Sequence, residues 1–86
     1  MQEINPNDMR FNAMNLLARR EHLRSELQIK LHKRFGSDAE VEPVLDQLVE
    51  EGLQSDERFV ESYIRARAQK GYGPERIRQD LRQKGA

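Results

Sequence analysis

The two histidines are the side chains best suited to metal binding or general base catalysis, and their spacing favours neither. His22 and His32 are ten positions apart, whereas two metal ligands on one helix face are normally four apart. Lys30, Lys33 and Arg34 lie beside His32 in the sequence, and their positive charges would repel a metal cation. We therefore expect no metal site.

Other catalytic patterns are missing as well. Gly71 and Gly73 lack the flanking strand and the following lysine of a nucleotide-binding glycine loop. The sequence has no cysteine, which excludes disulfides, thiolate metal ligands and a cysteine nucleophile. The many carboxylates follow helix faces rather than an apolar pocket that would shift their pKa. We expect no enzymatic activity, no cofactor and no small-molecule substrate.

The arginines near the C-terminus give better support for a binding function. Arg78 and Arg82 are four positions apart, so they share one flank of a helix, and Arg76 falls on the other flank within reach of Asp80. The pattern is typical either of a solvated basic helix or of a surface for anions or acidic proteins. The candidate partner-binding residues are the basic side chains expected on exposed faces: Arg20, Arg65, Lys70, Arg76, Arg78, Arg82 and Lys84.

Arg67 is expected to be structural instead. On a helical wheel it falls between Tyr63 and Val60, inside the apolar arc, and Arg19 falls at the same angle of an earlier helix. Two inward arginines suggest packed stems and pairs with acids or helix-end carbonyls. The residues assigned structural roles are Arg19, Arg67, Phe59, Gly71, Gly73 and Pro74.

The stretch from Lys70 to Pro74 predicts a sharp turn between two helices. Gly71 is suited to the left-handed conformation that ends a helix, Gly73 to an N-cap, and Pro74 to the first helical position. Between the glycines, Tyr72 either packs back on the turn or faces a partner. The outline is that of a helix-turn-helix.

Capping and periodicity predict about five helices in an all-α protein. The first opens at Asn5-Pro6 and ends near Arg20. Its apolar residues cover more than half its circumference, so we expect it to be packed between neighbours. The later helices are expected to start at His22 to Ser25 and end at Phe35, to follow caps at Ser37, Asp38 and Glu40 and end before Gly52, to run from Asp56 to Lys70, and to run from Glu75 to Lys84.

Two helix faces carry residues of uncertain purpose. In the third helix Glu42, Asp46 and Glu50 line the side opposite the apolar stripe, which favours a solvated face over an acidic docking surface. Pro43 belongs in the first turn, where it costs least. In the second helix Ile29 points away from the other apolar residues, which favours an ordinary exposed side chain over a partner contact.

Charge is segregated along the chain although the total is zero. Residues 1–37 hold seven basic and four acidic side chains, residues 38–61 hold one and nine, and residues 62–86 hold seven and two. The chain of 86 residues has 36% apolar and 35% charged residues, which leaves a thin core. No apolar run approaches the roughly 20 residues needed to span a bilayer, so we expect a cytoplasmic protein without membrane contact.

An internal repeat relates the two halves. Arg10-Phe11 recurs as Arg58-Phe59, and Leu16 precedes Ile64 by 48 positions; beyond the turn, Leu27 and Leu31 precede Ile77 and Leu81 by 50. We expect a lead-in over 1–9, a three-helix repeat over 10–54, and the first two helices of a second repeat over 55–86. The absence of a third helix predicts incomplete burial of Phe59, Ile64 or Ile77, and a less ordered C-terminal unit.

Taken together, these segments strongly resemble the RecX family, whose members regulate the bacterial recombinase RecA. The resemblance covers nearly the whole chain from Arg10 on. It is carried by Leu16-Leu17-Ala18-Arg19-Arg20-Glu21-His22, Glu26-Leu27, Asp56-Glu57-Arg58-Phe59, Tyr63, Arg65, Arg67, Gly71-Tyr72-Gly73-Pro74, Ile77, Leu81 and Lys84-Gly85.

The resemblance implies tandem three-helix repeats that bind the RecA–DNA filament in its groove, with DNA contact inside the filament. It implies a non-enzymatic regulator of recombinase, ATPase and coprotease activity in DNA repair and the SOS response. Two departures stand out. Leu23 occupies a position where the family usually has a capping serine, so Ser25 or the backbone must compensate. Family members typically have three repeats, whereas this chain ends after the first two helices of the second, as expected either of a fragment or of a naturally short relative.

Two other functions fit the same features. The helix after Pro74 would enter the major groove of duplex DNA if Glu75, Arg76 and Gln79 read bases, although the acidic segment 38–61 would repel a duplex. A helical adaptor between proteins, with no link to nucleic acid, is the third reading.

Overall fold

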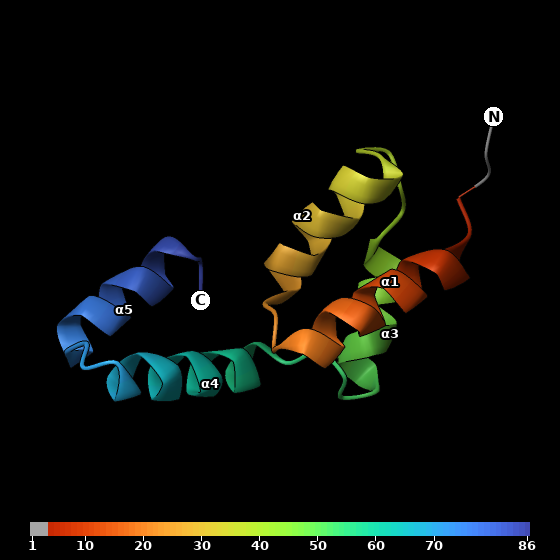
Figure 1. Cartoon of the computed structure of the whole chain (residues 1–86). Helices are drawn as coiled ribbons and strands as arrows, with labels where there is room; N and C mark the ends of the chain where they lie inside the picture. The colour runs from red at the N-terminus through yellow and green to blue at the C-terminus, as the bar shows by residue number, and fades with distance from the viewer. Residues whose placement is uncertain (1–3) are drawn as a thin grey trace. The chain divides into compact units, whose positions relative to one another are not determined.

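The computed structural model describes residues 4–86, and this part of the chain forms five helices and no strand (Figure 1). The predicted all-α class is therefore confirmed. Residues 1–3 of the predicted lead-in lie outside the described residues. The helices are α1 (Pro6–Arg19), α2 (Arg24–Phe35), α3 (Glu42–Glu50), α4 (Asp56–Gln69) and α5 (Pro74–Gln83).

The helices form two compact units, one ending at Ser55 and one running from Asp56 to Ala86. Unit 1 contains α1, α2 and α3, each in contact with the other two, and unit 2 contains α4 packed on α5. The relation of the two units as copies of one repeat stays a prediction from the sequence.

The start of α1 follows the predicted chemistry. Asn5 is the N-cap, and its side-chain oxygen accepts a hydrogen bond of 2.9 Å from the backbone N–H of Asn7. Pro6 occupies the first turn, where its missing N–H costs nothing. The expected cap and proline are both confirmed.

The start of α2 is capped by Glu26 rather than by Ser25. The Glu26 carboxylate accepts a 2.9 Å hydrogen bond from the backbone N–H of Leu23, the N-cap residue. Leu23 itself is buried, so a side chain that cannot cap a helix contributes apolar burial instead. Glu26 thus supplies the compensation that the absence of a serine at position 23 requires.

The predicted caps of α3 are wrong. Ser37, Asp38 and Glu40 precede the helix, whose N-cap is Val41, without a side-chain cap. Val41 is buried, because the segment before the helix already contributes to the core. Pro43 lies in the first turn as predicted. The helix ends at Glu50, and Gly52 beyond it has a φ of 75° and forms part of a Schellman motif. In this motif the Leu53 N–H donates to the Leu48 carbonyl at 2.9 Å.

The core of unit 1 is a seam between α3 and the pair α1–α2. Leu27 and Leu31 of α2 and Leu45 and Leu48 of α3 have no exposed surface. A fully buried leucine side chain stabilises the fold by roughly 1.5–3 kcal/mol relative to an exposed one. The buried cluster consists of Met9, Ala13, Leu27, Leu31, Ala39, Val41, Val44, Leu45 and Leu48.

The first helix is less enclosed than predicted. Only Met9 and Ala13 are buried in α1, whereas Phe11 is 68% exposed and Met14 is 40% exposed. The contacts of α1 with α2 and α3 cover one side of the helix, so its wide apolar arc exceeds the surface that two neighbours bury. Ile29 of α2 is exposed, as expected.

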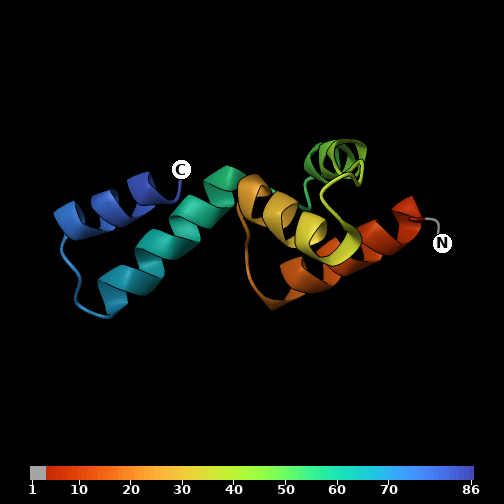
Figure 2. The ribbon, with the colours of Figure 1, turned by 90° about the horizontal axis from the view of Figure 1, so that it is seen from above.

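Unit 2 is a helical hairpin in which the glycine turn joins α4 to α5 (Figure 2). Gly71 has a φ of 90°, and the Tyr72 N–H donates to the Arg67 carbonyl at 3.1 Å, which completes a Schellman motif at the end of α4. Gly73 is the N-cap of α5, and Pro74 follows in the first turn. The predicted turn is therefore confirmed.

Burial in unit 2 is confined to Phe59, Ile77 and Leu81 among the described apolar side chains. Ile64 is 43% exposed. Of the three residues expected to be incompletely covered, the structure exposes Ile64 and buries the other two.

The glycine turn allows a test with a matched control. Substitution Gly71→Ala should lower the stability of unit 2 by about 1–2 kcal/mol, because a side chain disfavours left-handed backbone. No atom lies within 4 Å of the added Cβ, so the loss is conformational. The control Gly73→Ala, at a φ of −74°, should cost less. Tyrosine fluorescence during denaturation suits the measurement, since both tyrosines lie in unit 2; equal losses would contradict the assignment.

Candidate partner-binding surface

Cations and tyrosine rings alternate along one side of unit 2, and we name this set the cation ladder: Lys84, Tyr63, Arg67, Tyr72 and Arg76. The Arg67 guanidinium lies 5.0 Å from the ring centre of Tyr63 and 5.4 Å from that of Tyr72. Arg76 lies 4.5 Å from the Tyr72 ring, and the Lys84 ammonium lies 5.7 Å from the Tyr63 ring. Attraction between a cation and an aromatic face holds these side chains in sequence.

The ladder is anchored at its tyrosines. Phe59 stacks on Tyr63 with ring centres 5.7 Å apart, and the Tyr63 hydroxyl donates to Asp80 at 3.4 Å. Tyr72 is half-buried between Arg67 and Arg76, so it packs back on the turn. Asp80, expected near Arg76, lies within hydrogen-bond distance of Tyr63 instead.

Arg67 and Arg19, both predicted to point inward, differ in their burial. Arg67 is half-buried and contacts two tyrosine rings, where pairs with acids or helix-end carbonyls were expected. Arg19 is exposed at the end of α1, so its predicted inward position is wrong. The reason is that α1 is covered on a single side, and position 19 lies outside the covered strip.

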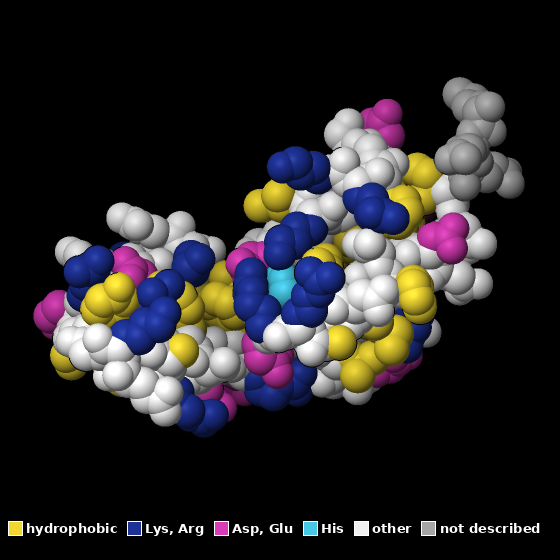
Figure 3. Space-filling model, in the orientation of Figure 1, with side chains coloured by type: hydrophobic (Ala, Val, Ile, Leu, Met, Phe, Trp, Pro, Cys, Tyr) yellow, Lys and Arg dark blue, Asp and Glu magenta, His cyan; other side chains and the backbone are white. Residues whose placement is uncertain are grey.

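The other predicted binding residues of unit 2 are exposed. They are Arg65, Lys70, Arg78 and Arg82. Arg78 forms a 3.1 Å ion pair with Glu75 one turn earlier. An exposed ion pair of this kind contributes little to stability, so Arg78 can change partner at low cost. Figure 3 shows Lys and Arg side chains of unit 2 beside hydrophobic ones on the viewed face. This surface suits a partner that combines negative charge with apolar groups.

Arg20 is the predicted binding residue least free to bind. Its two terminal nitrogens lie 3.3 and 3.2 Å from the two carboxylate oxygens of Glu26, and one also donates to the Glu21 carbonyl at 2.8 Å. Burial raises the pKa of Glu26, but the hydrogen bonds from Arg20 and the Leu23 N–H outweigh it and lower that pKa overall. Arg20 and Glu26 together fix the α1–α2 corner.

His22, for which the sequence predicted no role, is buried in unit 1, and both of its ring nitrogens have hydrogen-bond partners. Its Nδ1 lies 3.0 Å from the Arg20 carbonyl, and its Nε2 lies 2.9 Å from the Lys30 ammonium. Lys30 can only donate, so the geometry fits a neutral ring with its proton on Nδ1. The His22 carbonyl accepts a 3.1 Å bond from the buried Gln54 side chain. The sequence positions of the two histidines do not show that His22 is buried, because its contacts include residues farther along the chain.

The acidic face of α3 is partly neutralised by α2. Arg24 reaches Glu42 at 2.9 Å and Asp46 at 2.6 Å. A third contact links Gln28 of α2 to Glu42 at 3.0 Å. The carboxylates of α3 that were predicted to form a solvated face therefore also link α3 to α2.

The described part of the chain contains neither a candidate metal site nor a candidate membrane-spanning helix. Within residues 4–86, no group of three or more histidine or carboxylate side chains is placed to hold a metal ion. Across the same residues, every helix is too short or too polar to cross a bilayer.

These features define a small helical protein whose second unit has a basic, partly apolar face. Comparison with known proteins identifies it further. Residues 55–85 match the family model described as RecX, second three-helix domain. The chain is RecX-like, and the resemblance seen in the sequence is confirmed.

The curated relatives support this over nearly the whole chain. A "Regulatory protein RecX" of Pseudomonas putida is 56% identical over 80 residues, which cover 93% of this chain and 51% of the relative. The protein of that name from Ectopseudomonas mendocina is 53% identical over 81 residues, covering 94% of this chain and 54% of the relative. The chain thus spans about half the length of these relatives. No solved structure matches.

Arg67 can be tested as a structural residue. Substitution Arg67→Ala should lower the melting temperature of unit 2, because Tyr63 and Tyr72 lose the cation between them. The exposed Arg65→Ala, two positions earlier, removes the same charge and should leave the melting temperature nearly unchanged. Circular dichroism during heating compares them. A binding defect in Arg67→Ala at unchanged melting temperature would reverse the assignment.

His22 should make stability depend on pH. Burial lowers the pKa of His22 below its ordinary value of 6.5, and the charges of Arg20 and Lys30 act in the same direction, against the Arg20 carbonyl and Glu26. The unfolded chain therefore takes up the proton first. Stability is full above pH 6.5 and falls as the pH drops through the lowered pKa, by at most about 1.4 kcal/mol per pH unit. Urea unfolding from pH 7.5 to 5 measures the slope, and His22→Gln should reduce it.

Proposed function

We propose that this protein is a non-enzymatic regulator that binds the RecA–DNA filament and inhibits or modulates its recombinase, ATPase and coprotease activities. The observation that carries the proposal is the RecX similarity over 93% of the chain, with relatives named regulatory proteins. Because the chain spans about half of those relatives, the activity of the whole relative is part of the proposal.

The charges of unit 2 support binding to a filament. Residues 62–86 carry seven basic and two acidic side chains, and the cation ladder keeps three of the cations aligned. A filament formed on DNA contains phosphate groups at a regular spacing. A basic surface with fixed spacing is complementary to such a polymer and speeds association.

Direct reading of duplex DNA is less well supported by the side chains. The N-terminal part of α5 would have to reach base edges. Arg76 there is stacked on Tyr72, and Glu75 is paired with Arg78. The third function, a helical adaptor between proteins, also fits the exposed surface. The binding assay below distinguishes it from filament binding.

The test compares binding to three targets: bare duplex, bare single strand, and a RecA filament fixed with a non-hydrolysed nucleotide. We expect binding to the filament to be strongest and to weaken as salt rises, because exposed charges are screened. Tight, sequence-dependent binding to bare duplex would overturn the proposal. Binding to none of the three would leave the adaptor.

A pair of double variants locates the surface. Arg65→Ala with Arg82→Ala should weaken filament binding several-fold, at roughly 0.2–1 kcal/mol per exposed charge. The control, Lys33→Ala with Arg34→Ala, removes the same charge from exposed positions of unit 1. Equal weakening by both pairs would show that total charge, and not this surface, determines binding.

A further inference from the structure

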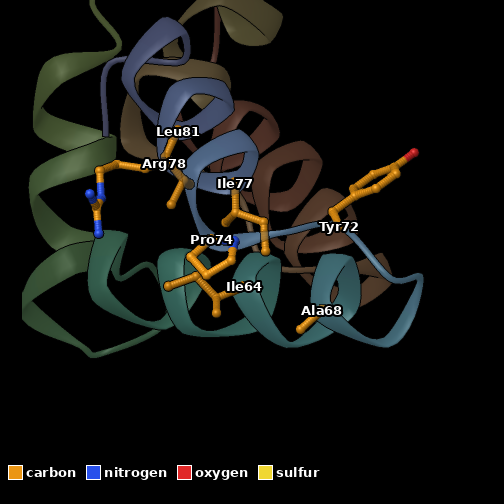
Figure 4. Close-up of a pocket in the computed structure, with 7 residues that line it drawn as sticks. All are labelled: Ile64, Ala68, Tyr72, Pro74, Ile77, Arg78 and Leu81. Carbon is orange, nitrogen blue, oxygen red and sulfur yellow. The ribbon is translucent and has the colours of Figure 1, made fainter.

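Lys30 is held at the surface of unit 1 by a neutral partner. Lys30 is exposed, and its ammonium lies 2.9 Å from Nε2 of the buried His22. Arg78 of unit 2 shows the ordinary case: its side chain extends from α5 (Figure 4) and pairs with the Glu75 carboxylate at 3.1 Å. An imidazole can accept a hydrogen bond from an ammonium only while the ring is neutral, because both nitrogens of the protonated ring are donors. The position of the Lys30 ammonium therefore depends on a proton.

The acid that would ordinarily pair with Lys30 is already engaged. Glu26 precedes Lys30 by four positions, which is the spacing at which a glutamate and a lysine pair on a helix. The Glu26 carboxylate instead accepts hydrogen bonds from the Leu23 N–H at 2.9 Å and from Arg20 at 3.2 and 3.3 Å. His22 thus takes the place of a carboxylate as the partner of Lys30.

The surroundings of His22 oppose a positive charge on its ring. Nδ1 lies 3.0 Å from the Arg20 carbonyl, so the single ring proton of the neutral form is used there. The charged groups that act on the ring are Arg20 at the end of α1 and Glu26 and Lys30 on α2. The segment after α3 contributes the uncharged Gln54, which donates to the His22 carbonyl. Two cations and one carboxylate therefore face the ring, and a protonated ring would repel the Lys30 ammonium at contact distance.

We propose that His22 is a proton-operated switch that controls the position of the Lys30 ammonium. While the ring is neutral, Nε2 holds the ammonium against unit 1. When the ring takes up a proton, the ammonium moves away from it into solvent, where an anionic partner can contact it. The hydrogen bonds that Glu26 accepts from Arg20 and Leu23 keep the α1–α2 corner in place during this change. The inference goes beyond the function proposed above and does not depend on filament binding.

An NMR titration of the intact protein from pH 7.5 to 5 tests the switch. The imidazole nitrogen shifts of His22 report its protonation, and the nuclear Overhauser effect between its ring and the Lys30 side chain reports their contact. We expect this contact to be lost with the midpoint of the His22 titration, below pH 6.5, because burial lowers the pKa of His22. The side-chain signals of Lys33, which is exposed three positions later, are the control and should show no inflection.

Two substitutions distinguish the switch from a contact that serves only the fold. Lys30→Met keeps the apolar part of the side chain and removes its charge, so it should raise the pKa of His22 toward 6.5. The matched Lys33→Met should leave that pKa unchanged. His22→Gln retains an oxygen that accepts and an amide that donates, but it does not titrate. The inflection at Lys30 should therefore vanish in this variant.

Three results would overturn the proposal. They are a contact between Lys30 and His22 that survives protonation of the ring, a pKa of His22 that Lys30→Met leaves unchanged, and an inflection at Lys30 that persists in His22→Gln. Loss of the contact together with the backbone amide dispersion of unit 1 would also overturn it, because unfolding would then be the cause. If His22→Gln does not fold, the comparison of Lys30→Met with Lys33→Met decides the question.

Discussion

Two helices bury only the strip along which they touch, and this geometric limit governs the protein. In unit 1 a third helix closes the pair α1–α2 and removes Leu27, Leu31, Leu45 and Leu48 from water. In unit 2 the pair α4–α5 buries three large side chains and leaves Ile64 half uncovered. The second unit therefore relies more on other interactions than the first.

The cation ladder supplies part of that support. Packing a guanidinium between tyrosine rings stabilises the hairpin without enlarging its apolar core. The same arrangement keeps positive charge at the surface, where a partner can meet it. The proposed binding surface thus lies beside the side chains that stabilise the hairpin, with Arg67 inside the ladder and Arg65 outside it.

The sequence was most informative where local chemistry decides the structure. The asparagine cap of α1, the glycine ends of α3 and α4, and Pro74 were all predicted, because each depends on residues within a few positions of it. The surface positions of Arg65, Arg78 and Arg82 followed from helical periodicity. The RecX resemblance added the family.

Other features depend on contacts between distant residues. Nothing local distinguishes the buried His22 from an exposed one, since Lys30 and Gln54 reach it from elsewhere in unit 1. The exposure of Arg19 and Phe11 follows from how many helices cover α1. The caps predicted for α3 were wrong because the helix starts later than expected, after Val41, whose side chain is buried in the core.

The ladder also has an implication for how such sequences vary. A planar guanidinium can lie against rings on both of its faces, whereas an ammonium is a compact, strongly hydrated point charge. Exchange of Arg67 for lysine would keep the net charge and lose the stacking with Tyr63 and Tyr72. Variation at these three positions should therefore be correlated among relatives, with loss of one ring tolerated where the arginine has also been replaced.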